Sequence, residues 1–212
     1  MNYRDFVASR FKSAESTHQD IAIRVTPQAV AGLHASMGLL GEVVELLQAI
    51  NNNDTANVLE ELGDCAFFLE AAYQAYWLPQ YTTPRQSIAS TETLLIACCD
   101  LQDLAKKEVI YCKPATREIS ARREELLDIA SRALEGVCKL WGTTLEAVQA
   151  ENMLKLMLRH PTGYTNASAQ ARADKVCTAC DGDGVDYLTP AHWPQGGFYP
   201  LWPMCTIPDE EY

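Results

Sequence analysis

Apolar residues recur with a helical period over most of the first 160 positions of the chain. Within 27–51, a period of 3.6 residues places Leu39, Val43, Leu46 and Ile50 on one stripe. Gly and Pro are sparse over 1–160 and fall near the expected helix boundaries. The pattern predicts helices near 2–13, 27–51, 55–77, 86–111, 116–141 and 143–160.

The breaks between these helices carry clear local signals. Thr26-Pro27 combines a capping hydroxyl with a proline at the first helical position, and 51–54 is a polar break. Beyond about 161, Gly, Pro, Thr and aromatic residues replace the helical pattern. We therefore expect an all-α domain over 1–164, containing a hairpin over 27–77 and a last helix over 143–160. An irregular, Cys-containing tail should follow over 165–212.

Two pairs of acidic residues lie on consecutive helices of the predicted hairpin. Glu42 and Glu45 are three residues apart, as are Glu61 and Asp64, so each pair projects from one side of its helix beside the apolar stripe. Around the first pair the sequence is rich in Gly and Ala, including Gly38 and Gly41, which should leave space over the carboxylates. A single such Glu would ordinarily be solvated helix surface.

Pairing of the two helices should bring the four carboxylates to one cleft. The short polar break between the helices predicts that they pack antiparallel. Four acidic groups close together repel strongly in a site of low dielectric constant, and a hard divalent cation removes that repulsion. The oxygen ligands indicate Mg²⁺ or Mn²⁺.

The order and spacing of these motifs resemble the all-α NTP pyrophosphohydrolases of the MazG-like and dimeric dUTPase-like superfamily. The similarity includes His34-x-x-x-Gly38-Leu39-x-x-Glu42-x-x-Glu45 and, after fifteen residues, Glu61-x-x-Asp64. It extends to the opening Met1–Phe6 and to Asn152-x-x-Lys155-Leu156-x-x-Arg159, and it covers about 1–77 and 143–172. The resemblance implies a four-helix-bundle-like MazG-type fold.

The resemblance also implies an activity and a set of site residues. We expect Mg²⁺- or Mn²⁺-dependent hydrolysis of a ribo- or deoxynucleoside triphosphate to the monophosphate and pyrophosphate, with attack at the α-phosphorus. dUTP, dGTP, dATP and damaged deoxynucleotides all remain open as substrates. Glu42, Glu45, Glu61 and Asp64 are the expected catalytic and metal-binding residues, with Glu45 favoured as the general base. The expected substrate-binding residues are His34, Asn152, Lys155 and Arg159, with Phe68, Tyr73 and Trp77 as aromatics able to stack on a base.

The segment 86–141 reads like a degenerate copy of the first hairpin. Asp100 and Asp103 repeat the first spacing, and Glu125 and Asp128 repeat the second. The copy has lost the Gly-rich surroundings, so we do not expect it to hold the catalytic metal ions. It contributes Lys106, Lys107 and Lys113, and we include Lys106 and Lys107 among the residues that can meet phosphates; ordinary solvated lysines are the alternative.

The tail contains a separate cysteine motif. Cys177 and Cys180 form a C-x-x-C-x-G-x-G pattern similar to DnaJ-like zinc knuckles, which supplies half of a zinc site. His192 and Cys205 are the local residues that can complete it. A free or redox-active thiol pair is the alternative.

Composition narrows the class of protein. Of 212 residues, 48% are hydrophobic and 21% are charged, with a formal net charge of −11, which disfavours nucleic-acid partners. No run of 18 apolar residues and no signal-peptide pattern occurs, so we expect a cytoplasmic protein without a membrane partner. We expect a homodimer or higher homo-oligomer. The alternatives are a non-catalytic acidic helical partner-binding protein and a zinc-dependent regulator.

Overall fold

The computed structural model describes residues 2–78 and 86–171, and within them the chain is almost wholly helical. No β-strand occurs in this described part, where a single bridge joins Pro161 and Gly163. The predicted all-α fold is confirmed. The helices are α1 (Tyr3–Arg10), α2 (Ala14–Arg24), α3 (Pro27–Asn51), α4 (Thr55–Ala75), α5 (Thr91–Val109), α6 (Arg117–Leu140), α7 (Leu145–Arg159) and α8 (Asn166–Ala171).

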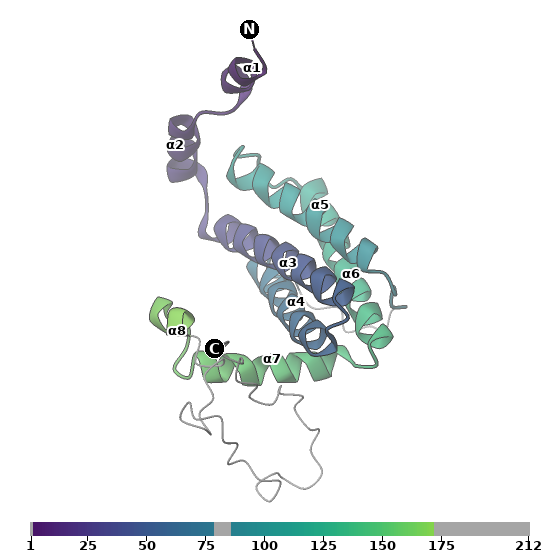
Figure 1. The fold of residues 1–212 in the computed structure, drawn as a ribbon. Coiled ribbons are helices and arrows are strands. Elements are labelled where there is room, and N and C mark those ends of the chain that lie inside the picture. Colours follow the sequence, from purple (N-terminus) through teal and green to yellow (C-terminus); the bar gives the residue numbers. More distant parts are fainter. Residues whose placement is uncertain (1, 79–85, 172–212) are drawn as a thin grey trace, which may run out of the picture.

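Helices α3 to α6 form a four-helix bundle (Figure 1). α3 packs against α4 and α5, while α6 packs against α5 and α4, so that each helix has two neighbours within the bundle. α7 packs against α4 on the outside of the bundle, and α1 and α2 lie apart from it at the N-terminal end. The predicted bundle therefore closes within one chain.

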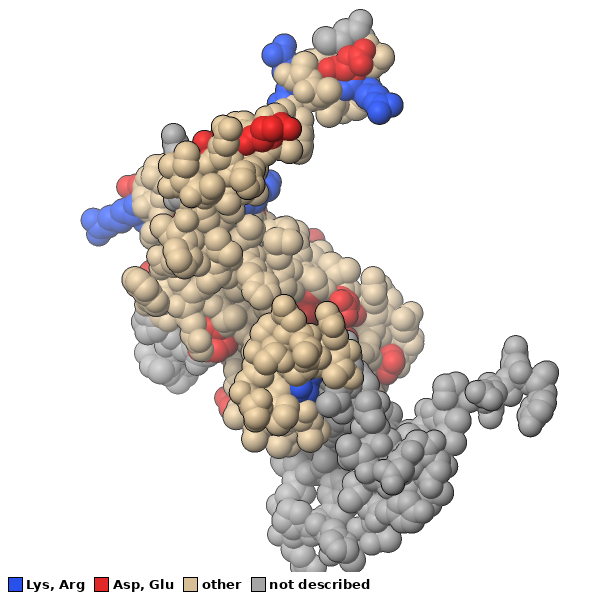
Figure 2. All heavy atoms as spheres, turned by 90° about the vertical axis from the view of Figure 1, so that its left-hand side faces the viewer, with Lys and Arg blue, Asp and Glu red and all other residues tan. Residues whose placement is uncertain are grey.

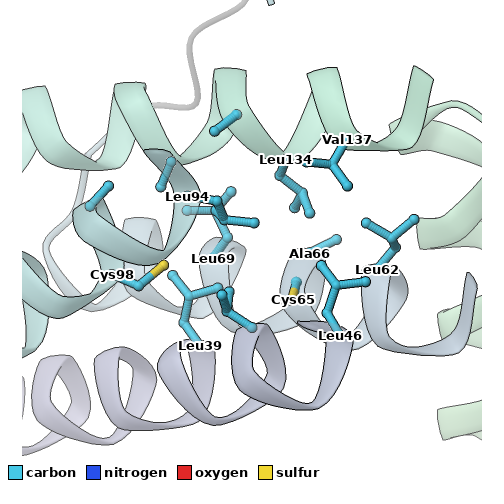
Figure 3. Close-up of a cluster of buried hydrophobic side chains, with 14 of the residues drawn as sticks. Leu39, Leu46, Leu62, Cys65, Ala66, Leu69, Leu94, Cys98, Leu134 and Val137 are labelled. Carbon is cyan, nitrogen blue, oxygen red and sulfur yellow. The ribbon is translucent and has the colours of Figure 1, made fainter. Parts of the chain in front are cut away.

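The core is built from the apolar stripes of the four bundle helices (Figure 3). Leu39 and Leu46 of α3 meet Leu62 of α4, Leu94 of α5 and Leu134 of α6, and all five side chains are fully buried. Burial of a leucine side chain contributes about 2 kcal/mol, so these stripes supply the main drive for helix association. The small Cys65, Cys98 and Cys138 are buried among them as free thiols.

Polar caps set where the helices begin. The side chains of Thr26, Asp54, Ser90, Thr116 and Thr144 each accept a hydrogen bond from the backbone N–H three residues later. Such a cap satisfies one of the first four N–H groups, which have no partner inside the helix. The Thr26-Pro27 signal predicted the bounds of α3 correctly.

Three helix boundaries differ from the prediction. The expected helix over 2–13 ends at Arg10, and a separate helix, α2, begins after the Ser13 cap. α5 begins at Thr91 instead of 86, because the segment before it runs along α6, where the Ile88 N–H donates to the Arg132 carbonyl at 2.9 Å. The expected irregular tail begins with the short helix α8.

α3 is the one described helix long and apolar enough to cross a membrane by length and composition. This is weak evidence, because core helices of soluble proteins pass the same test. Leu39, Val43 and Leu46 of α3 are fully buried in the bundle core. Burial of this stripe accounts for part of the apolar character of α3, which does not show a membrane protein.

A buried cation and an aromatic ring together connect all four bundle helices. Arg123 of α6 is 5% exposed, and its Nη2 lies 2.7 Å from Oε2 of Glu108 on α5. Its guanidinium lies 3.9 Å from the ring centroid of Tyr76, which caps α4. The Tyr76 ring in turn occupies the space over Gly32 of α3, where a Cβ atom would be 2.0 Å from the phenol oxygen.

We predict that Arg123→Ala lowers the free energy of unfolding by about 3 kcal/mol, because it leaves the half-buried Glu108 without its partner. Chemical denaturation measures the effect. Arg122→Ala is the matched control on the same helix: Arg122 is exposed and pairs with Asp100 and Glu125, so its loss should cost less than about 1 kcal/mol. Equal costs for the two variants would contradict the structural role given to Arg123.

Candidate metal and nucleotide site

Three of the four predicted carboxylates form a compact cluster between α3 and α4. One carboxylate oxygen from each of Glu42, Glu45 and Glu61 lies within 4.8 Å of the others. Glu42 and Glu45 lie one helical turn apart on α3, and Glu61 faces them from α4. Glu61 is 7% exposed, Glu42 is partly buried and Glu45 is exposed, so the cluster runs from the core boundary out to solvent.

Mutual repulsion and burial shift the acidity of this cluster. Burial, followed by the charges of Asp64, Glu42, Glu45 and Glu60, raises the pKa of Glu61 to about 8. Burial and the charges of Asp64 and Glu45 also raise the pKa of Glu42, although a hydrogen bond with Glu61 and the charge of Lys155 oppose that shift. The protein thus concentrates negative charge here beyond what its own cations neutralise.

Asp64, the fourth predicted carboxylate, is held by α7. Its carboxylate accepts a hydrogen bond from the Asn152 amide at 2.5 Å and pairs with the Lys155 ammonium at 2.5 Å. Lys155 also lies 3.3 Å from Glu60 and is 8% exposed. Gly63 permits this approach, since a Cβ atom there would lie 3.0 Å from the Asn152 Cβ and from the Val148 carbonyl.

Asn152 and Lys155 therefore position Asp64 in this structure. The sequence places them with the phosphate-binding residues, and direct contact of either with substrate stays a prediction. Both are buried where α7 packs against α4.

A polar cavity of about 350 Å³ opens over the carboxylates, and we call it the carboxylate cavity. Arg159, from the last turn of α7, is part of its wall together with all four predicted carboxylates. Asn57 and Glu60 also line it, although neither is among the site residues predicted from the sequence. Their spacing contained the signal, because Asn57 and Glu60 lie four residues before Glu61 and Asp64 and so share their face of α4.

The donor set of the carboxylate cavity fits a divalent cation. Carboxylate oxygens are the ligands that Mg²⁺ and Mn²⁺ prefer, and three of them are already close enough to share one ion. A cation would also remove the repulsion that raises the pKa of Glu42 and Glu61. The cluster can hold such an ion without a large rearrangement of the helices.

The acidic residues of the second hairpin are in a different environment. Asp100 and Glu125 pair with Arg122, Asp103 pairs with Lys106 and Lys107, and Asp128 lies 3.7 Å from Arg132. Cations of α5 and α6 thus neutralise them, unlike Glu42, Glu45 and Glu61. Lys106 and Lys107 do not line the carboxylate cavity formed by the described residues, and their contact with phosphate stays a prediction.

The small residues on α3 are explained by different features of the structure. We expected Gly38 and its neighbours to leave space over the carboxylates, and for Gly38 this is wrong. Its missing side chain makes room for the Phe68 ring, which would lie 2.3 Å from a Cβ atom. The exposed His34 ring lies edge-on to the partly buried Phe68 ring, at 6.0 Å between ring centroids. Neither ring lines the carboxylate cavity of the described chain.

The other two predicted aromatic residues differ in their exposure to solvent. Tyr73 is buried in the core, whereas Trp77 is 83% exposed at the end of α4.

The predicted zinc ligands lie outside the described residues, so the zinc site stays a prediction. They are Cys177, Cys180, His192 and Cys205.

Fold and site together define an all-α protein whose helical hairpin presents an acidic cluster able to bind a divalent cation. Residues 33–75, which span most of α3 and all of α4, match the family model of the MazG nucleotide pyrophosphohydrolase domain. This match confirms the MazG-like resemblance and supports nucleotide pyrophosphohydrolase activity in general. Comparison with curated proteins and with solved structures found no match.

We predict that Glu61→Gln abolishes Mn²⁺ binding, because Glu61 contributes the buried oxygen of the cluster. Titration calorimetry on the folded variant measures the loss, and circular dichroism confirms its helix content. Asp100→Asn, in the second hairpin, should bind Mn²⁺ like the wild type because its carboxylate already pairs with Arg122. If Glu61→Gln keeps wild-type affinity, the metal site lies elsewhere.

Proposed function

We propose that the protein is a Mg²⁺- or Mn²⁺-dependent nucleoside triphosphate pyrophosphohydrolase. The observation that carries the proposal is the cluster of Glu42, Glu45 and Glu61 at the wall of a polar cavity, within the segment that matches the MazG domain. Such a cavity suits a polyphosphate only when cations offset the acidic wall. The substrate would enter with its phosphates over the carboxylate cavity.

Each carboxylate has a distinct place in this proposal. Glu42, Glu45 and Glu61 would hold the cation, and Asp64, which Asn152 and Lys155 of α7 hold in place, would be the fourth ligand. When bound, the cation would supply charge neutralisation and polarise the phosphate and the attacking water. These carboxylates would fix the point at which the triphosphate docks.

Glu45 is the residue we assign as general base. It is the most exposed member of the cluster, so its carboxylate can take a proton from water and pass it to solvent. The water oxygen forms a bond to the α-phosphorus, and the bond from that phosphorus to the bridging oxygen breaks. Pyrophosphate leaves with the electron pair of the broken bond, and the nucleoside monophosphate remains.

Two cations of α7 would assist the leaving group. Arg159 lines the carboxylate cavity, and a guanidinium can bind two phosphate oxygens at once. Lys155 lies one turn earlier, bound to Asp64 and Glu60. The sequence contains no Gly-rich phosphate loop followed by Lys and Ser or Thr, which γ-phosphate cleavage in P-loop enzymes requires.

The alternative of an acidic partner-binding protein has less support. On the face shown in Figure 2, the acidic side chains of the described residues occur as separate groups and form no single patch. The acidic residues that gather most closely in the described chain line the carboxylate cavity between α3 and α4, where a metal ion and a nucleotide fit better than a protein surface. The zinc-dependent regulator depends on the tail, which lies outside the described residues.

We predict that the purified protein with Mg²⁺ or Mn²⁺ converts at least one ribo- or deoxynucleoside triphosphate into the monophosphate and pyrophosphate. In ¹⁸O-labelled water the label should appear in the monophosphate, because the water oxygen bonds to the α-phosphorus. Mass spectrometry of the products measures this. Label confined to inorganic phosphate, with a diphosphate as the second product, would show that the attack takes place at the γ-phosphorus.

We predict that Arg159→Met lowers kcat/KM about tenfold or more, because it removes a charged hydrogen-bond donor to phosphate. Steady-state kinetics over a range of substrate concentrations provides the measurement. Arg122→Met is the control, since it removes an equal charge from the exposed face of the second hairpin. Matching losses in both variants would point to a general effect of net charge.

A further inference from the structure

A second cavity, of about 580 Å³, adjoins the carboxylate cavity. It lies along the outer face of α3, and we call it the amide cavity. Its wall shares Glu45, Asn57 and Glu61 with the carboxylate cavity, so the two spaces meet at the acidic cluster. Its volume falls within the range of roughly 300–1,000 Å³ typical of small-molecule sites.

Gly41 in the wall of the amide cavity is not required by the packing of the fold. At Gly32, Gly38, Gly63 and Gly136, the other glycines inside the described helices, an added Cβ atom would meet a neighbour at 3.0 Å or less. At Gly41 nothing lies within 4 Å of that position. Glycine is unfavourable inside a helix, so a glycine that no packing contact requires needs another reason.

The lining of the amide cavity differs in chemistry from that of the carboxylate cavity. Away from the shared acidic wall it is uncharged, with the apolar side chains of Met37, Leu40 and Val44 on α3. Four side-chain amides complete it, and within the described residues none of them has a hydrogen-bond partner. They are Gln48, Asn52, Asn57 and Gln102.

A nucleobase has the properties that this lining would recognise. Its flat faces are apolar enough to lie against Met37, Leu40 and Val44, while its edge carries the hydrogen-bond donors and acceptors that amides pair with. Gly41 and Glu45 are one helical turn apart, so a nucleoside over Gly41 would have its phosphates near the carboxylates.

We propose that the amide cavity binds the base and sugar of the nucleotide and that Gly41 keeps open the space which they occupy. This inference rests on the proposed function, since it places the triphosphate of the same substrate over Glu42, Glu45 and Glu61. Gly41 then acts as a specificity-determining residue because any side chain there enters the nucleoside space. Gln102 brings α5 of the second hairpin into base recognition.

The test compares Gly41→Leu with wild type for two probes in the presence of Mn²⁺. One probe is the set of α,β-methylene analogues of the four deoxynucleoside triphosphates, and the other is inorganic tripolyphosphate, which lacks a nucleoside. We expect the leucine to weaken binding of the tightest analogue by roughly tenfold or more and to leave tripolyphosphate within about twofold. Titration calorimetry gives both dissociation constants.

Ala31→Leu is the matched control, because Ala31 is an exposed small residue on α3 that lines neither described cavity. It should leave both constants unchanged. Thermal unfolding should show Gly41→Leu to be at least as stable as wild type, since the added side chain meets open space. A second variant, Gln102→Met, removes the amide but keeps a side chain of similar size. It should therefore change the order of preference among the four analogues.

Four results would overturn the inference. Equal weakening of tripolyphosphate and nucleotide would place the effect at the carboxylates. Unchanged nucleotide affinity in Gly41→Leu would place the base elsewhere. The same holds if sedimentation shows that Gly41→Leu alters only the oligomeric state of the protein. Wild-type protein that binds the analogues no better than tripolyphosphate would show that the base makes no contact. If analogue binding depends on Gly41 but the protein hydrolyses no nucleotide, the proposed function is wrong and the inference is still supported.

Discussion

The repulsion between carboxylates at the α3–α4 boundary is the constraint on which the rest of the structure depends. Glu61 is nearly buried and lies with Glu42 and Glu45 in one cluster. Such a cluster opposes helix association, and the leucine core behind it must overcome that cost. α7 contributes to this balance, because Lys155 and Asn152 hold Asp64 and keep a fourth negative charge from being left without a partner.

Much of the bundle could be predicted from sequence because its signals are local. Thr26-Pro27 begins α3, and the apolar period continues without a break to the polar residues at its end. The boundary between α1 and α2 is not marked by Gly or Pro, and α1 buries no side chain, so the apolar pattern gives no signal there. The delayed start of α5 depends on a long-range contact, the hydrogen bond of Ile88 to Arg132, which no local pattern contains.

The site likewise contains some features that local sequence signals predict and others that depend on long-range contacts. Spacing alone predicted that Glu42, Glu45 and Glu61 meet, because three residues along a helix place side chains on one face. Spacing does not tell which partner a polar side chain chooses. Lys155 and Arg159 are one turn apart, yet Lys155 is bound to Asp64 and Arg159 reaches the cavity wall. The glycines of α3 show the same limit, since Phe68 explains Gly38 and nothing in the fold explains Gly41.

The two halves of the bundle therefore differ in how they neutralise their acidic residues. In the second hairpin, Asp100 pairs with Arg122, and Asp103 pairs with Lys106 and Lys107. These acidic residues therefore have cationic partners within their own half of the bundle. The first hairpin has no such cations of its own near Glu42 and Glu45 among the described residues, and its nearest ammonium comes from α7. A divalent cation held by Glu42, Glu45 and Glu61 would supply the neutralising charge that the second hairpin obtains from its own side chains.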